Sequence, residues 1–459
     1  MTTDFTCLPR VDIHVDASSS LGPLELWRHT LGHGGINPLP LPDRVVEGVH
    51  KLHPRLIRVF LQEHFAIYPD RGQFDWTKLD PYMDALDRTG AKVVAAITIK
   101  PPVLFPKVDH SLWRPTDWQE WQKVVYELVK RYSVEKPIVT HWEIGNETDI
   151  GESGGCPYLI PNPNDYLEYY RKTVEPIARA FPAAKVGGPA ACWVENEPLP
   201  GLVRLCREKG VQLDFISWHL YHDDPDRHAA GVARAKQLLA EFPEERRPEM
   251  MVTEWNKSFD RVSLEEMAFS PRRAANIAAI ILAFLEAGLD WSFYYHIWDQ
   301  TFHPEAFTSF FSPKGLAGMV EHWNEAPHRF GLFGVNGEVR PQYSVCQMLT
   351  GIGDERLPVT CTDAVVRTLA GRSEGKRSAF LANFALEGSR DLVADMRFSG
   401  LTPGRRLLAV RRMDDSCRWR NDTLELLPCE QREVHTPGDF RCQVWLPADS
   451  VATLTLTDL

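Results

Sequence analysis

Two stretches of the chain share one layout, in which a short apolar run stops at a glutamate. Residues 138–149 begin with β-branched and aromatic side chains and end in a polar segment that contains Asn146 and Glu147, and residues 248–256 reach Glu254 in the same way. Such runs are typical of buried strands that end in a loop. The carboxyl ends of parallel strands are where ligands bind in barrels and open sheets. We therefore expect both glutamates at the same edge of a parallel sheet.

The segments around these runs alternate between apolar strands and stretches with apolar residues at helical spacing. We expect strands at 55–61, 92–99, 138–144, 184–188, 213–219, 248–254 and 290–298, and helices at 76–86, 117–132, 166–181, 199–209, 231–241 and 271–287. With a first strand placed around 24–30, the count is about eight units, the number in a TIM barrel. Nearly continuous apolar strands separated by helices predict a parallel sheet, so the expected fold is a (β/α)8 barrel of the α/β class.

The spacing of the two glutamates provides a second argument for a barrel. A typical barrel has about 30 residues per unit, so strands three units apart are separated by about a hundred residues. Glu147 and Glu254 meet this expectation. The count assigns them to the fourth and seventh strands.

The sequence pattern changes after residue 351. Helical periodicity gives way to short alternating strands between turn-rich segments, for example 379–384, 406–410 and 451–456. This pattern predicts a C-terminal β-sandwich of about a hundred residues. The run 10–16 also alternates and is expected to join that sandwich. The expected domains are an N-terminal strand segment (1–20), a catalytic barrel (21–350) and a β-sandwich (351–459).

Composition argues against several classes of protein. The 51 basic and 62 acidic residues give a net charge of −11, which disfavours nucleic-acid and anionic-membrane partners. The start of the chain lacks the basic and apolar regions of a signal peptide, and no apolar run approaches the roughly 20 residues of a spanning helix, so we expect a cytoplasmic protein. The nine cysteines include no CxxC pair and are expected to be reduced thiols. The sequence leaves open whether the chain forms a homo-oligomer.

Two facing carboxylates can hydrolyse a glycoside, since one protonates the leaving oxygen while the other attacks the anomeric carbon or activates water. Taken singly, either glutamate is more often a solvated or salt-bridged residue, but two at strand ends with barrel spacing favour catalysis. Carboxylates at strand ends also bind metals. However, no HExxH motif accompanies them, and His219 and His222 are too few for a ligand set. We expect neither a metal nor another cofactor.

The chain resembles the retaining (β/α)8 glycosidases at both glutamates, in residues 142–147 and 252–256. Within that clan it is most similar to glycoside hydrolase family 39, the family of β-xylosidases and α-L-iduronidases. The family resemblance depends on the segments 186–190, 214–221, 330–335 and 340–343. It covers about residues 20 to 350 and implies a TIM barrel followed by a β-sandwich.

The resemblance also implies roles for individual residues. Glu147 is expected to be the acid/base and Glu254 the nucleophile. Asn146 is expected to hydrogen-bond the sugar 2-hydroxyl, and Arg58, at the end of the second strand, to keep the pKa of the nucleophile low. Further sugar contacts are expected from His219 and Tyr221 on the sixth strand and from Tyr295 and Trp298 on the eighth. For Tyr295 and Trp298, core packing is the alternative.

The chain departs from the family pattern in three places. The family usually has a histidine two residues after the second-strand arginine, where this chain has Phe60. It usually reads Trp-Asn-Glu-Pro around the acid/base, where residues 145–148 read Gly-Asn-Glu-Thr. The connection 299–329 is long and carries Phe307, Phe310, Phe311 and Trp323, a composition typical of a lid or subsite wall.

The sequence thus predicts a retaining exo-glycosidase that releases terminal sugars, of the β-xyloside type, from short glycosides by double displacement. The expected partner is a small oligosaccharide or glycoside. A uronic acid is the first alternative, because Lys100 at the end of the third strand could pair with a carboxylate, and an arabinoside or galactoside is also open. A sugar-binding barrel without turnover is an alternative of another class, against which the two glutamates argue. A metal-dependent hydrolase is a third alternative, which a test of activity with a chelator would distinguish.

Overall fold

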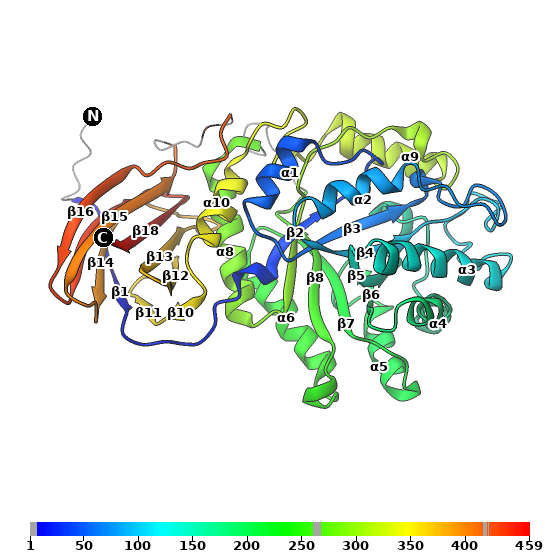
Figure 1. Cartoon of the computed structure of the whole chain (residues 1–459), viewed down its shortest axis with the longest axis horizontal. Helices are drawn as coiled ribbons and strands as arrows, with labels where there is room; N and C mark the ends of the chain where they lie inside the picture. Colours follow the sequence, from blue (N-terminus) through cyan, green and yellow to red (C-terminus); the bar gives the residue numbers. More distant parts are fainter. Residues whose placement is uncertain (1–6, 260–267, 416–419, 421) are drawn as a thin grey trace.

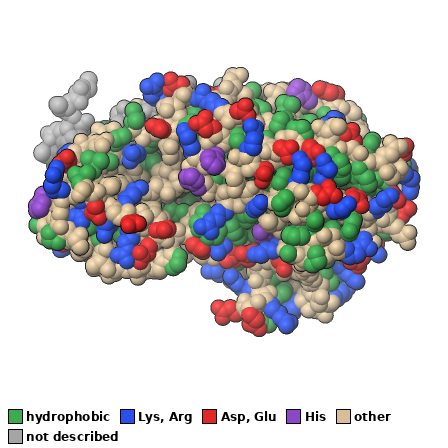
Figure 2. Space-filling model, viewed as in Figure 1, with side chains coloured by type: hydrophobic (Ala, Val, Ile, Leu, Met, Phe, Trp, Pro, Cys, Tyr) green, Lys and Arg blue, Asp and Glu red, His purple; other side chains and the backbone are tan. Residues whose placement is uncertain are grey.

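The computed structural model describes residues 7–259, 268–415, 420 and 422–459. Figure 1 shows two parts: a barrel surrounded by helices on the right and a domain of antiparallel strands on the left, with α8 and α10 between them. None of the helices in the described ranges is long and apolar enough to cross a membrane. On the face shown in Figure 2, acidic and basic side chains are interspersed.

Eight parallel strands close the barrel, and this confirms the predicted TIM fold. Each strand pairs with the next along the chain, and the last pairs with the first. The strands are β2 (His29–His33), β3 (Leu56–Gln62), β4 (Lys92–Thr98), β5 (Val139–Ile144), β6 (Lys185–Ala191), β7 (Phe215–Tyr221), β8 (Glu249–Asn256) and β9 (Trp291–Tyr295). Glu147 therefore follows the fourth barrel strand and Glu254 lies on the seventh, as the spacing predicts.

The helices pack their apolar faces against the outside of the barrel. They are α1 (Asp43–His50), α2 (Leu79–Asp87), α3 (Trp118–Val129), α4 (Pro163–Ala180), α5 (Leu199–Lys209), α6 (Pro225–Leu239), α8 (Pro271–Ala287) and α10 (Pro341–Thr350). Local chemistry sets their ends. Asp117 caps α3 by accepting from two backbone N–H groups, and α5 and α8 end at Gly210 and Gly288, which adopt positive φ.

The first and last barrel strands differ from the sequence prediction. The first was placed at 24–30, but residues Leu26–Arg28 form a 3-10 turn and β2 begins at His29. Its sequence, His-Thr-Leu-Gly-His, lacks the continuous apolar run of a central strand, because histidine and glycine occupy three of its five positions. The last strand was expected to reach residue 298, but β9 ends at Tyr295.

The left domain consists of two antiparallel-rich sheets around a separate core. One sheet has the order β10 (Glu355–Leu357), β12 (Val366–Ser373), β13 (Lys376–Asn383), β18 (Ser450–Asp458), β15 (Gly404–Met413) and β16 (Glu430–Thr436). The other has the order β11 (Val359–Cys361), β1 (Arg10–Asp16), β14 (Leu392–Ser399) and β17 (Phe440–Leu446). In Figure 1 the blue β1 lies beside the orange β14, and the two pair in parallel from Arg10 with Val393 to Asp16 with Ser399.

The connection 299–329 contains secondary structure of its own. It includes a 3-10 turn (Pro304–Ala306), the helix α9 (Pro313–Val320) and a π-helical turn (Glu321–Glu325). Phe307, Phe310 and Phe311 pack with Ile36 and Met319 in a cluster that is separate from the barrel core. The connection is therefore a folded unit with its own small core.

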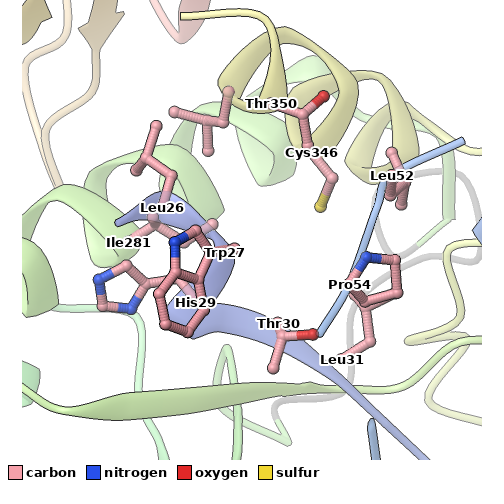
Figure 3. Close-up of a pocket in the computed structure, with 11 residues that line it drawn as sticks. Leu26, Trp27, His29, Thr30, Leu31, Leu52, Pro54, Ile281, Cys346 and Thr350 are labelled. Carbon is pink, nitrogen blue, oxygen red and sulfur yellow. The ribbon is translucent and has the colours of Figure 1, made fainter. Parts of the chain in front are cut away.

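A small cavity lies at the amino end of β2, opposite the predicted site. Figure 3 shows its lining, which includes Leu26 and Trp27 before the strand, Ile281 on α8, and Cys346 and Thr350 on α10. Its volume is about 40 Å³, far below the roughly 300 Å³ or more of typical ligand sites. A sugar does not fit there.

Candidate active site

A sharp backbone turn directs Glu147 into the mouth of the barrel. β5 ends at Ile144, Gly145 has a φ of +91° and Glu147 a φ of +43°, and the Glu147 N–H donates to Ala190 O on β6 at 2.8 Å. A Cβ at position 145 would lie 2.8 Å from Thr148 Cγ2. The positive φ and this close approach favour glycine at position 145, where the chain departs from the family pattern.

A second glycine leaves room for the Glu147 carboxylate. Gly154 ends a short 3-10 helix (Gly151–Gly154), and a Cβ built on it would lie 1.9 Å from Glu147 Oε2. Its carbonyl oxygen accepts from Asn146 Nδ2 at 3.1 Å. The segment after Glu147 thus folds back against the carboxylate and restricts its position.

The two glutamates face each other across the barrel axis. One carboxylate oxygen of Glu147, one of Glu254 and a ring nitrogen of His219 all lie within 4.8 Å of one another. His219 Nδ1 is 2.7 Å from Glu147 Oε1, a hydrogen-bonding distance, and its Nε2 is 3.7 Å from Glu254 Oε1. Both glutamates are less than 8% exposed. The site therefore holds two carboxyl groups close together and out of bulk water.

Arg58 on β3 connects three groups beneath the site. Its guanidinium donates to Glu143 Oε2 at 2.8 Å, to Glu254 Oε1 at 2.5 Å and to Asn146 Oδ1 at 2.7 Å. Arg58 and Glu143 are fully buried. The sequence argument placed Arg58 beside the nucleophile but did not identify Glu143. Glu143 lies two residues before Gly145 and faces the inside of the barrel, and a charged residue at such a position could have been recognised as part of the site.

Tyr221 binds the other oxygen of Glu254. Its hydroxyl donates to Glu254 Oε2 at 2.6 Å, so each oxygen of this carboxylate accepts a hydrogen bond, one from Arg58 and one from Tyr221. Tyr221 and His219 are two residues apart on β7 and therefore point to the same face. The strand delivers one side chain to each glutamate.

The environments of the two glutamates separate their pKa values. Burial is the main cause that raises the pKa of Glu147 well above its ordinary value, and the neighbouring charges of Glu254 and Asp149 raise it further. Burial also raises the pKa of Glu254, but Arg58 and Tyr221 oppose that effect. Arg58 thus lowers the pKa of Glu254, the direction expected of it, while burial has the larger effect and raises it. Glu147 is the group that retains a proton to higher pH.

His219 is neutral in this setting. Burial and the charge of Arg58 lower the pKa of His219 well below its ordinary value. Glu147, His219 and Glu254 together meet the distance requirement of a three-ligand metal site. Glu254, however, already accepts from the guanidinium of Arg58, and His219 Nδ1 is engaged with Glu147. The geometry suits proton transfer between carboxyl groups better than coordination of a cation.

A cavity of about 360 Å³ opens above the two glutamates. Barrel strands and the segment after Glu147 form its lower part, and the 299–329 connection forms part of its upper wall. The residues that line it are Gly35, Ile36, Phe60, Gln62, Glu147, Ile150, Ser153, Gly154, Gly155, Cys192, Trp193, Tyr221, Glu254, Phe259, Tyr295, Met319, His322, Trp323 and His328. Its volume matches that of a site for a small ligand.

The remaining sequence-predicted residues are divided between the cavity and its surroundings. Tyr295 lines the cavity, and its hydroxyl donates to Gly34 O at 2.8 Å. Trp298 lies outside the lining, where its indole N–H donates to Val335 O at 3.2 Å. Two tryptophans line the cavity, Trp193 and Trp323, and the ring centroid of Trp323 is 6.2 Å from that of Tyr295. The long connection therefore supplies the indole expected from the eighth strand.

Lys100 does not reach the cavity. Its ammonium group donates to the backbone oxygens of Asp109 at 2.8 Å and Pro157 at 2.7 Å, and the residue is 2% exposed. The side chain holds two loops together. It is therefore not the partner of a substrate carboxylate that the uronic-acid alternative required.

The chain matches the model of the glycosyl hydrolases family 39 over residues 11–386. A β-xylosidase of Geobacillus stearothermophilus is 22% identical over 414 residues, with 81% of this chain and 76% of the relative covered. A β-xylosidase of Caldicellulosiruptor saccharolyticus is 25% identical over 315 residues, with 63% of this chain and 59% of the relative covered. Among solved structures, the GH39 enzyme from Xanthomonas axonopodis pv. citri superimposes with a TM-score of 0.77 at 18% identity, with 98% of this chain and 97% of that chain covered.

Proposed function

Because the chain belongs to the glycosyl hydrolases family 39 and is a glycoside hydrolase, we propose that it releases terminal β-xylosyl units by double displacement. In this proposal Glu147 is the acid/base and Glu254 the nucleophile. The observation that carries it is the approach of one oxygen from each carboxylate to within 4.8 Å. Retaining glycosidases hold their carboxyl groups about 5–5.5 Å apart, whereas inverting enzymes leave about 6.5–9.5 Å for a water molecule.

In the first step Glu254 attacks the anomeric carbon while Glu147 protonates the glycosidic oxygen, so the C–O bond breaks and the leaving alcohol departs neutral. The raised pKa of Glu147 supplies that proton at neutral pH. In the second step Glu147, now a carboxylate, takes a proton from water as the water oxygen attacks the same carbon. The ester to Glu254 breaks, and both groups return to their starting states.

The neighbours of the two glutamates assist these steps. Arg58 and Tyr221 donate to Glu254 and favour its ionised form before attack. Asn146 accepts from Arg58 and donates one amide hydrogen to Gly154 O, so its second hydrogen is proposed to bind the sugar 2-hydroxyl. Burial of the whole group strengthens these electrostatic interactions.

The test is a panel of aryl glycosides: β-xyloside, α-L-arabinoside, β-glucuronide, β-galactoside and α-L-iduronide. We expect the β-xyloside to be hydrolysed fastest, with β-xylose as the first product by NMR. Glu254→Ala should abolish turnover. Glu147→Ala should regain activity with azide, which attacks the anomeric carbon without needing a base, so that the ester to Glu254 breaks and a β-glycosyl azide is released. Xylo-oligosaccharides should release xylose alone if the action is exo.

Four results would contradict this proposal in whole or in part. An inverted first product would exclude double displacement, and faster hydrolysis of another panel member would exclude xylose as the preferred sugar. Loss of activity in a chelator would indicate a metal-dependent reaction. No turnover of any member would favour a sugar-binding protein.

A further inference from the structure

Three inward-facing side chains of β3 approach the cavity in sequence. Alternate residues of a barrel strand point to the same face, and Arg58, Phe60 and Gln62 have this spacing. Arg58 lies deepest and binds the nucleophile, and its guanidinium carbon is 4.2 Å from the centroid of the Phe60 ring. Phe60 and Gln62 both line the cavity. Of these two residues only Gln62 carries hydrogen-bonding groups, because a phenyl ring offers none of the conventional kind.

The orientation of the Gln62 amide is determined by one hydrogen bond. Its Nε2 donates to Gly155 O at 2.9 Å, and a flipped amide would place its oxygen against that carbonyl oxygen. The Oε1 atom has no hydrogen-bond partner among the residues that the structure describes, although Gln62 is only 1% exposed. A buried acceptor without a partner is costly, and a group in the cavity that donates a hydrogen bond would offset this cost.

We propose that Gln62 Oε1 accepts a hydrogen bond from one hydroxyl of the sugar in the cavity and thereby selects for it. This inference rests on the proposed function. An amide oxygen attracts a hydroxyl hydrogen but repels a carboxylate, so Gln62 favours a neutral sugar over a uronic acid at this position. A site built to bind a hydroxyl discriminates against an analogue that lacks it, because its own polar atom then stays unpaired.

The experiment pairs variants of the enzyme with variants of the substrate. Wild type, Gln62→Leu and Gln62→Met are assayed with the aryl glycoside that wild type hydrolyses fastest and with its 2-, 3- and 4-deoxy forms. We expect either substitution to lower kcat/KM about tenfold for the parent glycoside. For one deoxy form the loss should disappear, because the hydroxyl that Gln62 binds is already absent. Two substitutions allow one variant to be examined if the other does not fold.

Gln300→Leu is the matched control. Gln300 is likewise buried, at 2% exposed, donates through Nε2 to Asn37 Oδ1 at 2.8 Å and carries an Oε1 without a partner in the described part of the chain, but it lies outside the cavity lining. Any effect of this control should be equal for all four substrates. Thermal unfolding of each variant reports whether the fold is retained.

The outcomes separate the two proposals. Loss of the Gln62 effect with a single deoxy form supports the inference. An equal loss with all four substrates would overturn it and make Gln62 only a support for Gly155, and no loss at all would overturn it too. If wild type hydrolyses no glycoside, the proposed function fails first and this inference fails with it.

Discussion

The lower and upper parts of the cavity are built on different principles. The catalytic floor, which we define as Arg58, Glu143, Glu147, Tyr221 and Glu254, comes from β3, β7, β8 and the end of β5. Short, charge-assisted hydrogen bonds join four of these residues, because Arg58 donates to Glu143 and Glu254 and Tyr221 donates to Glu254. The upper wall comes mainly from the 299–329 connection and contributes apolar and aromatic surfaces, with a small core that is separate from the barrel.

This difference in construction implies different functions for the floor and the upper wall. Loss of Arg58 would leave Glu143 and Glu254 buried without their cation, and Glu147 and Glu254 are the reacting groups of the proposed mechanism, so the floor determines the reaction. The upper wall lines the cavity with Ile36, Met319 and Trp323, none of which takes part in the hydrogen bonds of the floor. Substitutions in the floor should therefore affect all substrates, and substitutions in the wall should affect some substrates more than others.

The largest effect is expected for Arg58→Met in the floor. The change leaves Glu143 and Glu254 buried without their cation, so the free energy of unfolding should fall by about 3–5 kcal/mol and kcat/KM by roughly 10²–10³-fold. Glu254 would take up a proton more readily in the variant, because the guanidinium of Arg58 lowers the pKa of its carboxyl group. The loss of stability should therefore be larger at neutral pH than at acid pH, as measured by urea unfolding.

Arg340→Met separates stability from catalysis. Arg340 is 2% exposed and pairs with the buried Asp299 at 2.5 Å, outside the cavity lining. We expect a similar loss of stability, with kcat retained in the folded fraction. Equal kcat losses in the two arginine variants would show that Arg58 acts only through the fold.

A smaller effect, on pH dependence, is expected for Tyr221→Phe. Glu254 must be ionised to attack, and the Tyr221 hydroxyl favours that state. Removal of the hydroxyl raises the pKa of Glu254, so the acid limb of the kcat/KM profile should move to higher pH by about one unit, with about a tenfold loss at the optimum. The alkaline limb, set by Glu147, should move much less.

Tyr343→Phe is the control for this shift. Tyr343 is buried and donates to Gly48 O at 3.1 Å, away from both glutamates. Its profile should match that of wild type. An unchanged acid limb in Tyr221→Phe would mean that another group determines it.

The smallest effect is expected in the upper wall, for Trp323→Leu. Loss of the indole should raise KM about three- to tenfold for aryl glycosides and leave the limbs of the pH profile in place. Trp298→Leu should leave KM unchanged, because that indole lies outside the lining. If Trp298→Leu raises KM and Trp323→Leu does not, the wall has been assigned to the wrong tryptophan. Uniform loss for all substrates in Trp323→Leu would remove the distinction between wall and floor.

The same distinction explains what could be predicted from the sequence. The strands that lead to Glu147 and Glu254 can be predicted from their apolar runs and from the spacing between the two glutamates. The helices α5 and α8 can be predicted from a proline at the start and a glycine at the end. The strand His29–His33 gives no such signal. The pairing of Arg58 with Glu143 and the orientation of the Gln62 amide depend on contacts between segments far apart in the sequence, so they were not predicted.

The upper wall was harder to predict for a related reason. Its aromatic residues were visible in the sequence, but not which of them point inward. Phe307, Phe310 and Phe311 fill the separate core, whereas Trp323 reaches the cavity. A connection with its own core carries no barrel register from which the direction of a side chain could be inferred.

The strand β1 comes from the start of the chain but pairs with strands from its C-terminal part, so the order of synthesis affects when this sheet can form. It is the inner strand between β11 and β14, and Val11, Ile13 and Val15 contribute to the core of the left domain. During synthesis this segment emerges early, whereas Val393, with which it begins its pairing to β14, emerges only after the whole barrel. The nascent chain must therefore carry an unpaired apolar strand past a complete barrel before the sheet can form. A recombinant protein that begins at residue 21 would contain the barrel and most of the sheet domain but would lack β1.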